Sequence, residues 1–190
     1  MFSSDEIEGQ NNNTPLKAGP SVPLELISVT KGDKNEINFN FKGTDKTNSG
    51  VFKYVAFAID RDHSSYTEDN EKRALARILH IGSRFAEEAV VRAAFKGTSW
   101  DNYADNVIKF FQGKTKGVAL RGKITIRVVN EGTKEQKVYN QFPAFPNFLS
   151  SDKFPAAFTT NPTYDKYVPS SEKITDTPDN LTAEENPLPF

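Results

Sequence analysis

Five segments of the chain have the hydrophobic pattern of β-strands. In residues 37–41 apolar residues alternate with Asn, and residues 51–59 are apolar enough for a mostly buried strand. Clusters of Gly, Asn and Asp with turn chemistry bound the early strands. The five predicted strands are residues 24–30, 37–41, 51–59, 118–129 and 137–145.

A different period fills the middle of the chain. Over residues 69–95 apolar positions recur every three or four residues, which predicts helix with a break near Gly82. A second helical pattern over residues 99–113 begins at Ser99, a residue type that caps helix N-termini. The predicted order is β-β-β-α-β-β. It is typical of the oligonucleotide-binding (OB) fold, a five-stranded, partly open barrel, here with a long helical insertion between strands three and four. We therefore predict a mainly β (β+α) domain; another α+β sheet is the alternative.

The ends of the chain lack hydrophobic periodicity. We expect residues 1–20 to form a disordered arm, residues 21–153 the OB-like domain, and residues 154–190 a flexible acidic tail. The N-terminus has no apolar segment of the secretory kind, and the longest apolar run is residues 54–59, so we expect a soluble, cytoplasmic protein. The chain has no Cys, which excludes disulfides and thiolate metal sites.

Charge is distributed unevenly along the chain. The net charge is −1, but residues 155–190 carry six acidic and two basic residues. Residues 109–137 carry eight basic residues against two acidic ones, a net charge of +6. A basic body with acidic ends indicates partners of opposite charge.

The basic segment suggests contacts with an unpaired polynucleotide. Alternation places Arg121, Lys123 and Arg127 on one strand face, where cations can follow successive phosphates. Tyr54 and Tyr139 are candidates for base stacking because a hydroxyl suits a half-exposed position. The alternative is the solvated outer face of an antiparallel sheet with its aromatic residues in the core. The predicted binding residues are Lys53, Tyr54, Arg121, Lys123, Arg127, Lys134, Lys137 and Tyr139, whereas Phe39, Phe41 and Phe57 are assigned to the core.

The chain ends in Pro187-Leu-Pro-Phe190, preceded by Glu184 and Glu185. This end resembles the acidic C-terminal tip, finishing in Pro-Phe, of bacterial and phage single-stranded DNA-binding proteins. Residues 120–129 and 138–142 also resemble the fourth and fifth strands of phage-encoded versions. The resemblance implies that Phe190, with Pro189, enters an apolar pocket on replication or recombination proteins, while basic residues of the partner hold the nearby acids.

Together these features predict a non-enzymatic protein without cofactor or metal that binds single-stranded DNA with little sequence preference in replication, recombination or repair. If the protein is phage-encoded, its compartment is the host bacterial cytoplasm. The first alternative is a structural, virion-type assembly protein without nucleic-acid affinity. A second is a metal-dependent nuclease at Asp60, Asp62 and His63, although a polar loop is the simpler interpretation of those residues.

Overall fold

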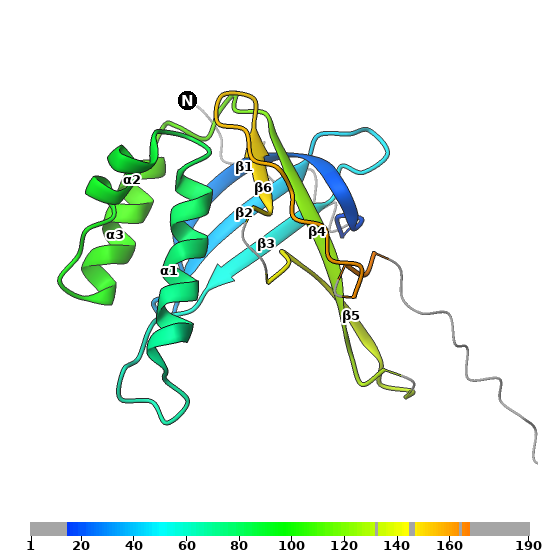
Figure 1. Ribbon diagram of the computed structural model, residues 1–190, viewed down its shortest axis with the longest axis horizontal. Helices are drawn as coiled ribbons and strands as arrows, with labels where there is room; N and C mark the ends of the chain where they lie inside the picture. Colours follow the sequence, from blue (N-terminus) through cyan, green and yellow to red (C-terminus); the bar gives the residue numbers. More distant parts are fainter. Residues whose placement is uncertain (1–14, 132, 145–146, 164, 168–190) are drawn as a thin grey trace, which may run out of the picture.

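The computed structural model describes residues 15–131, 133–144, 147–163 and 165–167. It combines strands with helices around a mostly antiparallel sheet (Figure 1). The strands are β1 (Gly19–Lys31), β2 (Ile37–Gly43), β3 (Val51–Ala56), β4 (Leu120–Val129), β5 (Lys137–Gln141) and β6 (Leu149–Ser151). The mixture of strands and helices is as predicted, and the predicted strand at 137–145 is shorter and is followed by β6.

The sheet is not closed. Its strands lie in the order β3-β2-β1-β4-β5, with β6 paired to the first residues of β4. Apart from the single bridge between Pro15 and Val51, the outer edge of β3 has no strand partner among the described residues, and neither does that of β5. The β4–β5 hairpin therefore extends away from β3, as Figure 1 shows.

Three helices connect β3 to β4 and gather on one side of the molecule (Figure 1). They are α1 (Glu68–Gly82), α2 (Glu88–Ala94) and α3 (Trp100–Phe111). The predicted N-cap is confirmed, because the Ser99 hydroxyl accepts a hydrogen bond from the N–H of Asn102 at 3.2 Å. The predicted break is also confirmed: α1 ends at Gly82, where a Cβ would lie 2.5 Å from Val91 of α2. Among the described residues, no helix has the length and apolar character needed to cross a membrane.

The core is rich in aromatic rings and lies between the sheet and the helices. Phe39 of β2 meets Phe111 of α3 edge to face at 5.7 Å between ring centroids. Phe142 stacks on Phe148 at 4.4 Å, which ties the chain after β5 to the start of β6. Such ring pairs stabilise a fold by roughly 0.5–1.5 kcal/mol beyond the burial of their area.

His80 of α1 connects this helix to β6. Its Nε2 accepts a hydrogen bond from the N–H of Leu149 at 3.1 Å, and its ring lies 4.7 Å from that of Phe148. The imidazole is largely buried, and Arg77 and Arg84 lie nearby. Burial, with a smaller contribution from the two guanidinium groups, lowers the pKa of His80 from its ordinary 6.5 to about 4.

We expect His80→Gln to reduce the loss of stability in acid. Between pH 6.5 and about 4 the unfolded chain binds a proton at His80 that the folded chain does not, so the free energy of unfolding falls as the pH falls. The full effect is about 3–4 kcal/mol, because the pKa falls from 6.5 to about 4 and each pKa unit corresponds to roughly 1.4 kcal/mol. Gln keeps an acceptor for the Leu149 N–H but does not titrate.

Urea unfolding measured from pH 7 to pH 4 tests this expectation. The control is His63→Gln, the same substitution at the other histidine, which lies in an exposed loop. Equal slopes for the wild type and His80→Gln would contradict the assignment.

Candidate nucleic-acid interface

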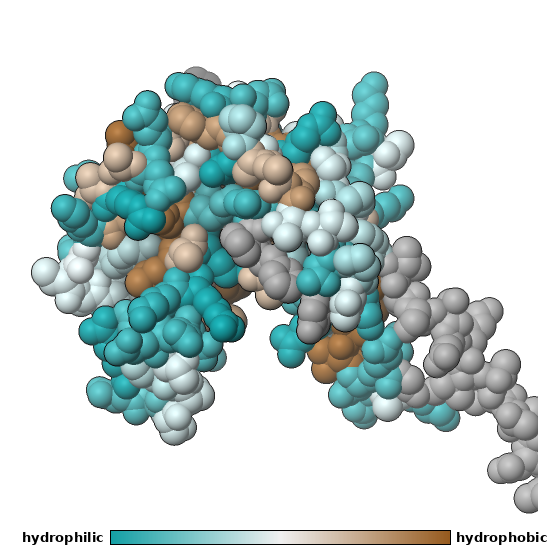
Figure 2. Space-filling view, in the orientation of Figure 1, coloured by the Kyte–Doolittle hydropathy of each residue, from teal (hydrophilic) through white to brown (hydrophobic). Residues whose placement is uncertain are grey.

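Two adjoining hollows lie where the sheet is open, between β3 and β5. They measure about 670 and 760 Å³ and share four lining residues. We call them together the β3–β5 groove; its first hollow lies toward α1 and its second toward residues 15–18. A notch between the helical part and the β4–β5 hairpin is visible in Figure 2. The shared residues are Phe52, Lys53, Tyr139 and Asn140.

The groove is lined by cations. Arg77 and Arg127 border the first hollow, Lys17 borders the second, and Lys53 borders both. No Asp or Glu occurs among the described residues that line either hollow. The lining therefore carries only positive formal charge, although the whole chain has a net charge of −1.

Exposed rings line the same hollows as these cations. Phe57 has 74% of its surface exposed and Tyr139 has 51%. Tyr54 presents a half-buried ring in the first hollow, and Tyr167 presents one in the second. A large ring exposed to this extent contributes little to core packing, so it is free to stack on a ligand.

Arg77 fixes the distance between the two walls of the first hollow. Its Nε donates to the Tyr54 hydroxyl of β3 at 3.1 Å. Its Nη1 and Nη2 donate to the carbonyls of Pro143 and Phe142, after β5, at 2.7 and 3.3 Å. The guanidinium also lies over the Tyr54 ring, 5.2 Å from its centroid. Because these donors are already used, we assign Arg77 to holding the groove open.

The second hollow is held by a contact between β5 and the N-terminal segment. The Asn140 side-chain amide donates to the carbonyl of Leu16, and the N–H of Leu16 donates to Val51 of β3 at 3.3 Å. Leu16 itself is buried in the core. Residues 15–20, which the sequence analysis placed in the arm, thus begin the fold and bring Lys17 to the groove.

The structure brings together four of the eight predicted binding residues. Lys53, Tyr54, Arg127 and Tyr139 all line the β3–β5 groove, with Arg127 opposite Tyr139 in the β4–β5 pairing. Lys134 and Lys137 are exposed on the β4–β5 hairpin but do not line the groove. Arg121 is also exposed, opposite Pro23 of β1 and Ser150 of β6, and lies outside the groove.

Lys123 lies where the alternation puts it, but it is covered. Only 3% of its side chain is exposed, because residues 152–163 and 165–167, which we call the strap, run across β4 (Figure 1). Its ammonium forms an ion pair with Asp165, whose side chain is 4% exposed, and donates to the carbonyl of Thr159. The prediction that Lys123 contacts a ligand directly is therefore incompatible with this position.

The strap is part of the folded body, not of a tail that begins at residue 154. Arg84, two residues after the end of α1, donates to the carbonyl of Phe154 at 2.8 Å, and the N–H of Ile126 donates to that of Lys166 at 2.8 Å. Burial alone would raise the pKa of Asp165, but hydrogen bonds from Lys123 and from the N–H of Asn161 outweigh it, and the pKa is lowered. Asp165 is thus held as a carboxylate.

Sequence reasoning missed three contributors to the groove and assigned a fourth to the core. Phe57 was placed in the core because it continues an apolar run, but β3 ends at Ala56 and Phe57 falls beyond the sheet. Lys17 and Tyr167 lay in segments read as disordered, and Arg77 lay in a helix whose position no local pattern specifies. The predicted tail residues Glu184, Glu185, Pro189 and Phe190 lie outside the described residues.

The loop considered as a metal site contains hydrogen bonds of its own. The N–H of Asp62 donates to the Asp60 carboxylate at 3.0 Å, and Nδ1 of His63 lies 2.8 Å from the Ser65 hydroxyl. Within the described ranges, no three His, Asp or Glu side chains come together in a way that would hold a metal ion. The nuclease alternative thus gains no support from this loop.

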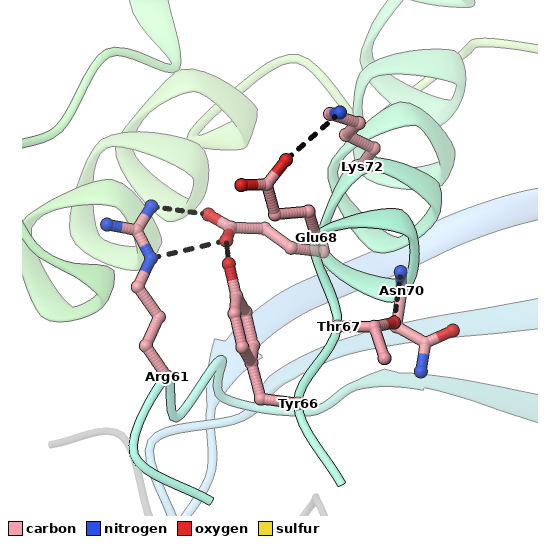
Figure 3. A network of polar contacts seen from close by, with 7 residues as sticks. Arg61, Tyr66, Thr67, Glu68, Asn70 and Lys72 are labelled. Atoms are coloured by element: carbon pink, nitrogen blue, oxygen red, sulfur yellow. Dashed lines mark hydrogen bonds and ion pairs between the residues drawn. The ribbon is translucent and has the colours of Figure 1, made fainter.

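Arg61 and Tyr66 of the same loop converge on the carboxylate of Glu71 in α1 (Figure 3). Arg61 contacts the two oxygens at 2.6 and 3.2 Å, and the Tyr66 hydroxyl donates at 2.5 Å. These hydrogen bonds, first that of Arg61, lower the pKa of Glu71. The network anchors the loop to the helix, and its three groups satisfy one another.

No family model matches the chain, and no curated protein or solved structure is significantly similar to it.

We expect Lys123→Met to destabilise the protein by about 3–5 kcal/mol, because it leaves the Asp165 carboxylate buried without its cation. The double variant Lys123→Met/Asp165→Leu should recover most of this loss, since two apolar side chains can fill the same space. Urea unfolding at pH 7 measures both free energies.

The matched control is Arg121→Met on the same face of the same strand. Arg121 is exposed, so this change should alter the free energy of unfolding by no more than about 0.5 kcal/mol. A Lys123→Met protein as stable as this control would show that the ion pair is not buried in solution.

Proposed function

We propose that this protein binds single-stranded DNA in the β3–β5 groove, without enzymatic activity. The observation that carries the proposal is the composition of the groove: Lys17, Lys53 and Arg127 line it together with the exposed rings of Phe57 and Tyr139, and the described lining contains no acid. Cations that follow a phosphate backbone and rings that stack on bases are the two components of sequence-tolerant single-strand binding.

The exposed rings favour an unpaired strand over a duplex. Bases of a duplex are stacked on one another and cannot lie flat on a protein side chain without being extruded. Phe57 and Tyr139 offer apolar faces rather than sets of hydrogen-bond donors, which is typical of binding that tolerates any base sequence. We propose sequence-tolerant binding for this reason.

The strand order supports an OB-type fold. In an OB barrel β3 meets β5, and the order β3-β2-β1-β4-β5 is that of such a barrel left open between these two strands. The groove lies at this opening. We therefore propose that the sheet is an open OB-type barrel whose gap receives the DNA.

The C-terminal residues have a second part in the proposal. Residues 168–190 contain five acidic residues and one basic residue, and they follow Tyr167, which lines the second hollow. We propose that this acidic segment competes with DNA for the groove, and that its Pro189-Phe190 end recruits replication or recombination proteins. An acidic segment that ends in one aromatic anchor suits such recruitment.

Binding to a labelled oligothymidylate, followed by fluorescence anisotropy, should weaken steeply as salt is added. With three to four phosphates neutralised, log K should fall against log salt with a slope of about −2 to −3. Lys53→Ala should weaken binding and make the slope shallower by about 0.7, because one phosphate contact is lost.

Lys109→Ala is the matched control, because Lys109 is exposed on α3 and does not line the groove. It should leave both the affinity and the slope close to those of the wild type. Failure of the wild-type protein to bind oligothymidylate at low salt would reject the proposed function and leave an assembly role.

Removing residues 168–190 should tighten binding to oligothymidylate at low salt, because it removes a net charge of −4 that comes directly after Tyr167 in the sequence. The cut falls after Tyr167, so the strap and its buried ion pair stay intact. A full-length variant with the five acids changed to Gln or Asn separates charge from length and should tighten binding equally. Unchanged or weaker binding by both variants would disprove the competition.

A further inference from the structure

Tyr167, the last residue that the structure describes, lines the β3–β5 groove. It is half-buried at the end of the strap and lines the second hollow beside Lys17, Lys53 and Tyr139. A strand of nucleic acid lying along the groove would meet Phe57 and Tyr139 in the first hollow and Tyr139 and Tyr167 in the second. Tyr167 is therefore a ring presented at the end of the groove that is remote from α1.

The residues just before Tyr167 are fixed to the sheet. The carbonyl of Lys166 accepts a hydrogen bond from the N–H of Ile126 in β4 at 2.8 Å. Asp165 forms the buried ion pair with Lys123. Its carboxylate accepts a hydrogen bond from the N–H of Asn161 at 2.7 Å, and its own N–H donates to the Asn161 carbonyl at 2.8 Å. Strand β4 thus places Arg127 at the first hollow. Through its hydrogen bond to Lys166, it also fixes the backbone just before Tyr167 beside the second hollow.

We infer that Tyr167 is a base-stacking residue of the groove, and that the Lys123–Asp165 pair is the positioning element that holds it there. This inference rests on the proposed function. Lys123 then serves DNA binding without touching DNA, through the strap that covers it.

A charged pair suits this task better than an apolar one. Residues 155–160 have no alternation that would fix their register against β4. An apolar contact tolerates sliding, but the Lys123 ammonium has to meet both the Thr159 carbonyl and the Asp165 carboxylate, which selects one register. Buried ion pairs cost desolvation energy, and fixing a register is the best-attested return for that cost.

The first test compares Tyr167→Ala with Tyr167→Phe in oligothymidylate binding. Stacking on one ring stabilises a bound base by roughly 1–3 kcal/mol, so Tyr167→Ala should weaken binding at least about fivefold with an unchanged salt slope. Tyr167→Phe keeps the ring and should bind within about twofold of wild type. Tyr139→Ala, in the same hollow, reports independently on the groove.

The results separate this inference from the proposed function. Wild-type affinity in Tyr167→Ala, together with weakened binding by Tyr139→Ala, would overturn the stacking role of Tyr167 and leave the proposed function standing. Absence of binding by the wild-type protein would overturn both. Weakened binding by both Ala variants supports both.

The second test asks whether the ion pair acts through Tyr167. The variant Lys123→Met/Asp165→Leu should unfold with nearly wild-type stability yet bind as weakly as Tyr167→Ala, and adding Tyr167→Ala to it should cause no further loss. If the ion pair had only a structural role, the double variant would recover wild-type DNA binding together with wild-type stability. Wild-type affinity in the double variant, or losses that multiply in the triple variant, would overturn the positioning role.

Discussion

Side chains rather than backbone pairs connect β3 to β5, and the rest of the structure depends on this constraint. Arg77 joins Tyr54 of β3 to the carbonyls of Phe142 and Pro143 after β5, and Asn140 of β5 reaches the carbonyl of Leu16. These contacts are longer than a strand-to-strand ladder, so they hold the two edges apart at a fixed separation. Each wall of the groove is an edge strand of the sheet, since β3 pairs with β2 and β5 pairs with β4.

Several carboxylates of the protein form ion pairs with cations outside the groove. Glu71 is bound by Arg61 and Tyr66 at the start of α1, and Asp101 and Asp105 of α3 both contact Lys31. The cations of the groove have no carboxylate among its described lining residues to neutralise them. A chain with a net charge of −1 thus contains a groove lined by positive charge alone, as the proposed single-stranded DNA ligand requires.

The strap buries the Lys123 ammonium, which would otherwise lie on the outer face of β4. Desolvating the Lys123 ammonium and the Asp165 carboxylate is costly, and their ion pair offsets this cost together with the Thr159 carbonyl and the Asn161 N–H. Without the strap, the middle of β4 would expose a lysine between Arg121 and Arg127, as the alternation suggested. With it, the outer face of β4 is divided: Arg121 lies apart from the groove, and Arg127 belongs to it.

The sequence by itself located β1 to β5 and the helical segments between β3 and β4, in their order, but not β6. Alternation located the strands, the change of period located the helices, and Gly82 and Ser99 marked a helix end and a cap, because these signals are local. It also identified half of the candidate site, since Lys53, Tyr54, Arg127 and Tyr139 combine charge with aromatic character on predicted strands. Tertiary structure alone decided that Lys123 is buried, that Phe57 is exposed, and that Lys17, Arg77 and Tyr167 meet at one groove. These outcomes depend on which distant segments pack together, and contacts between residues 36 to 124 positions apart leave no periodic trace in the chain.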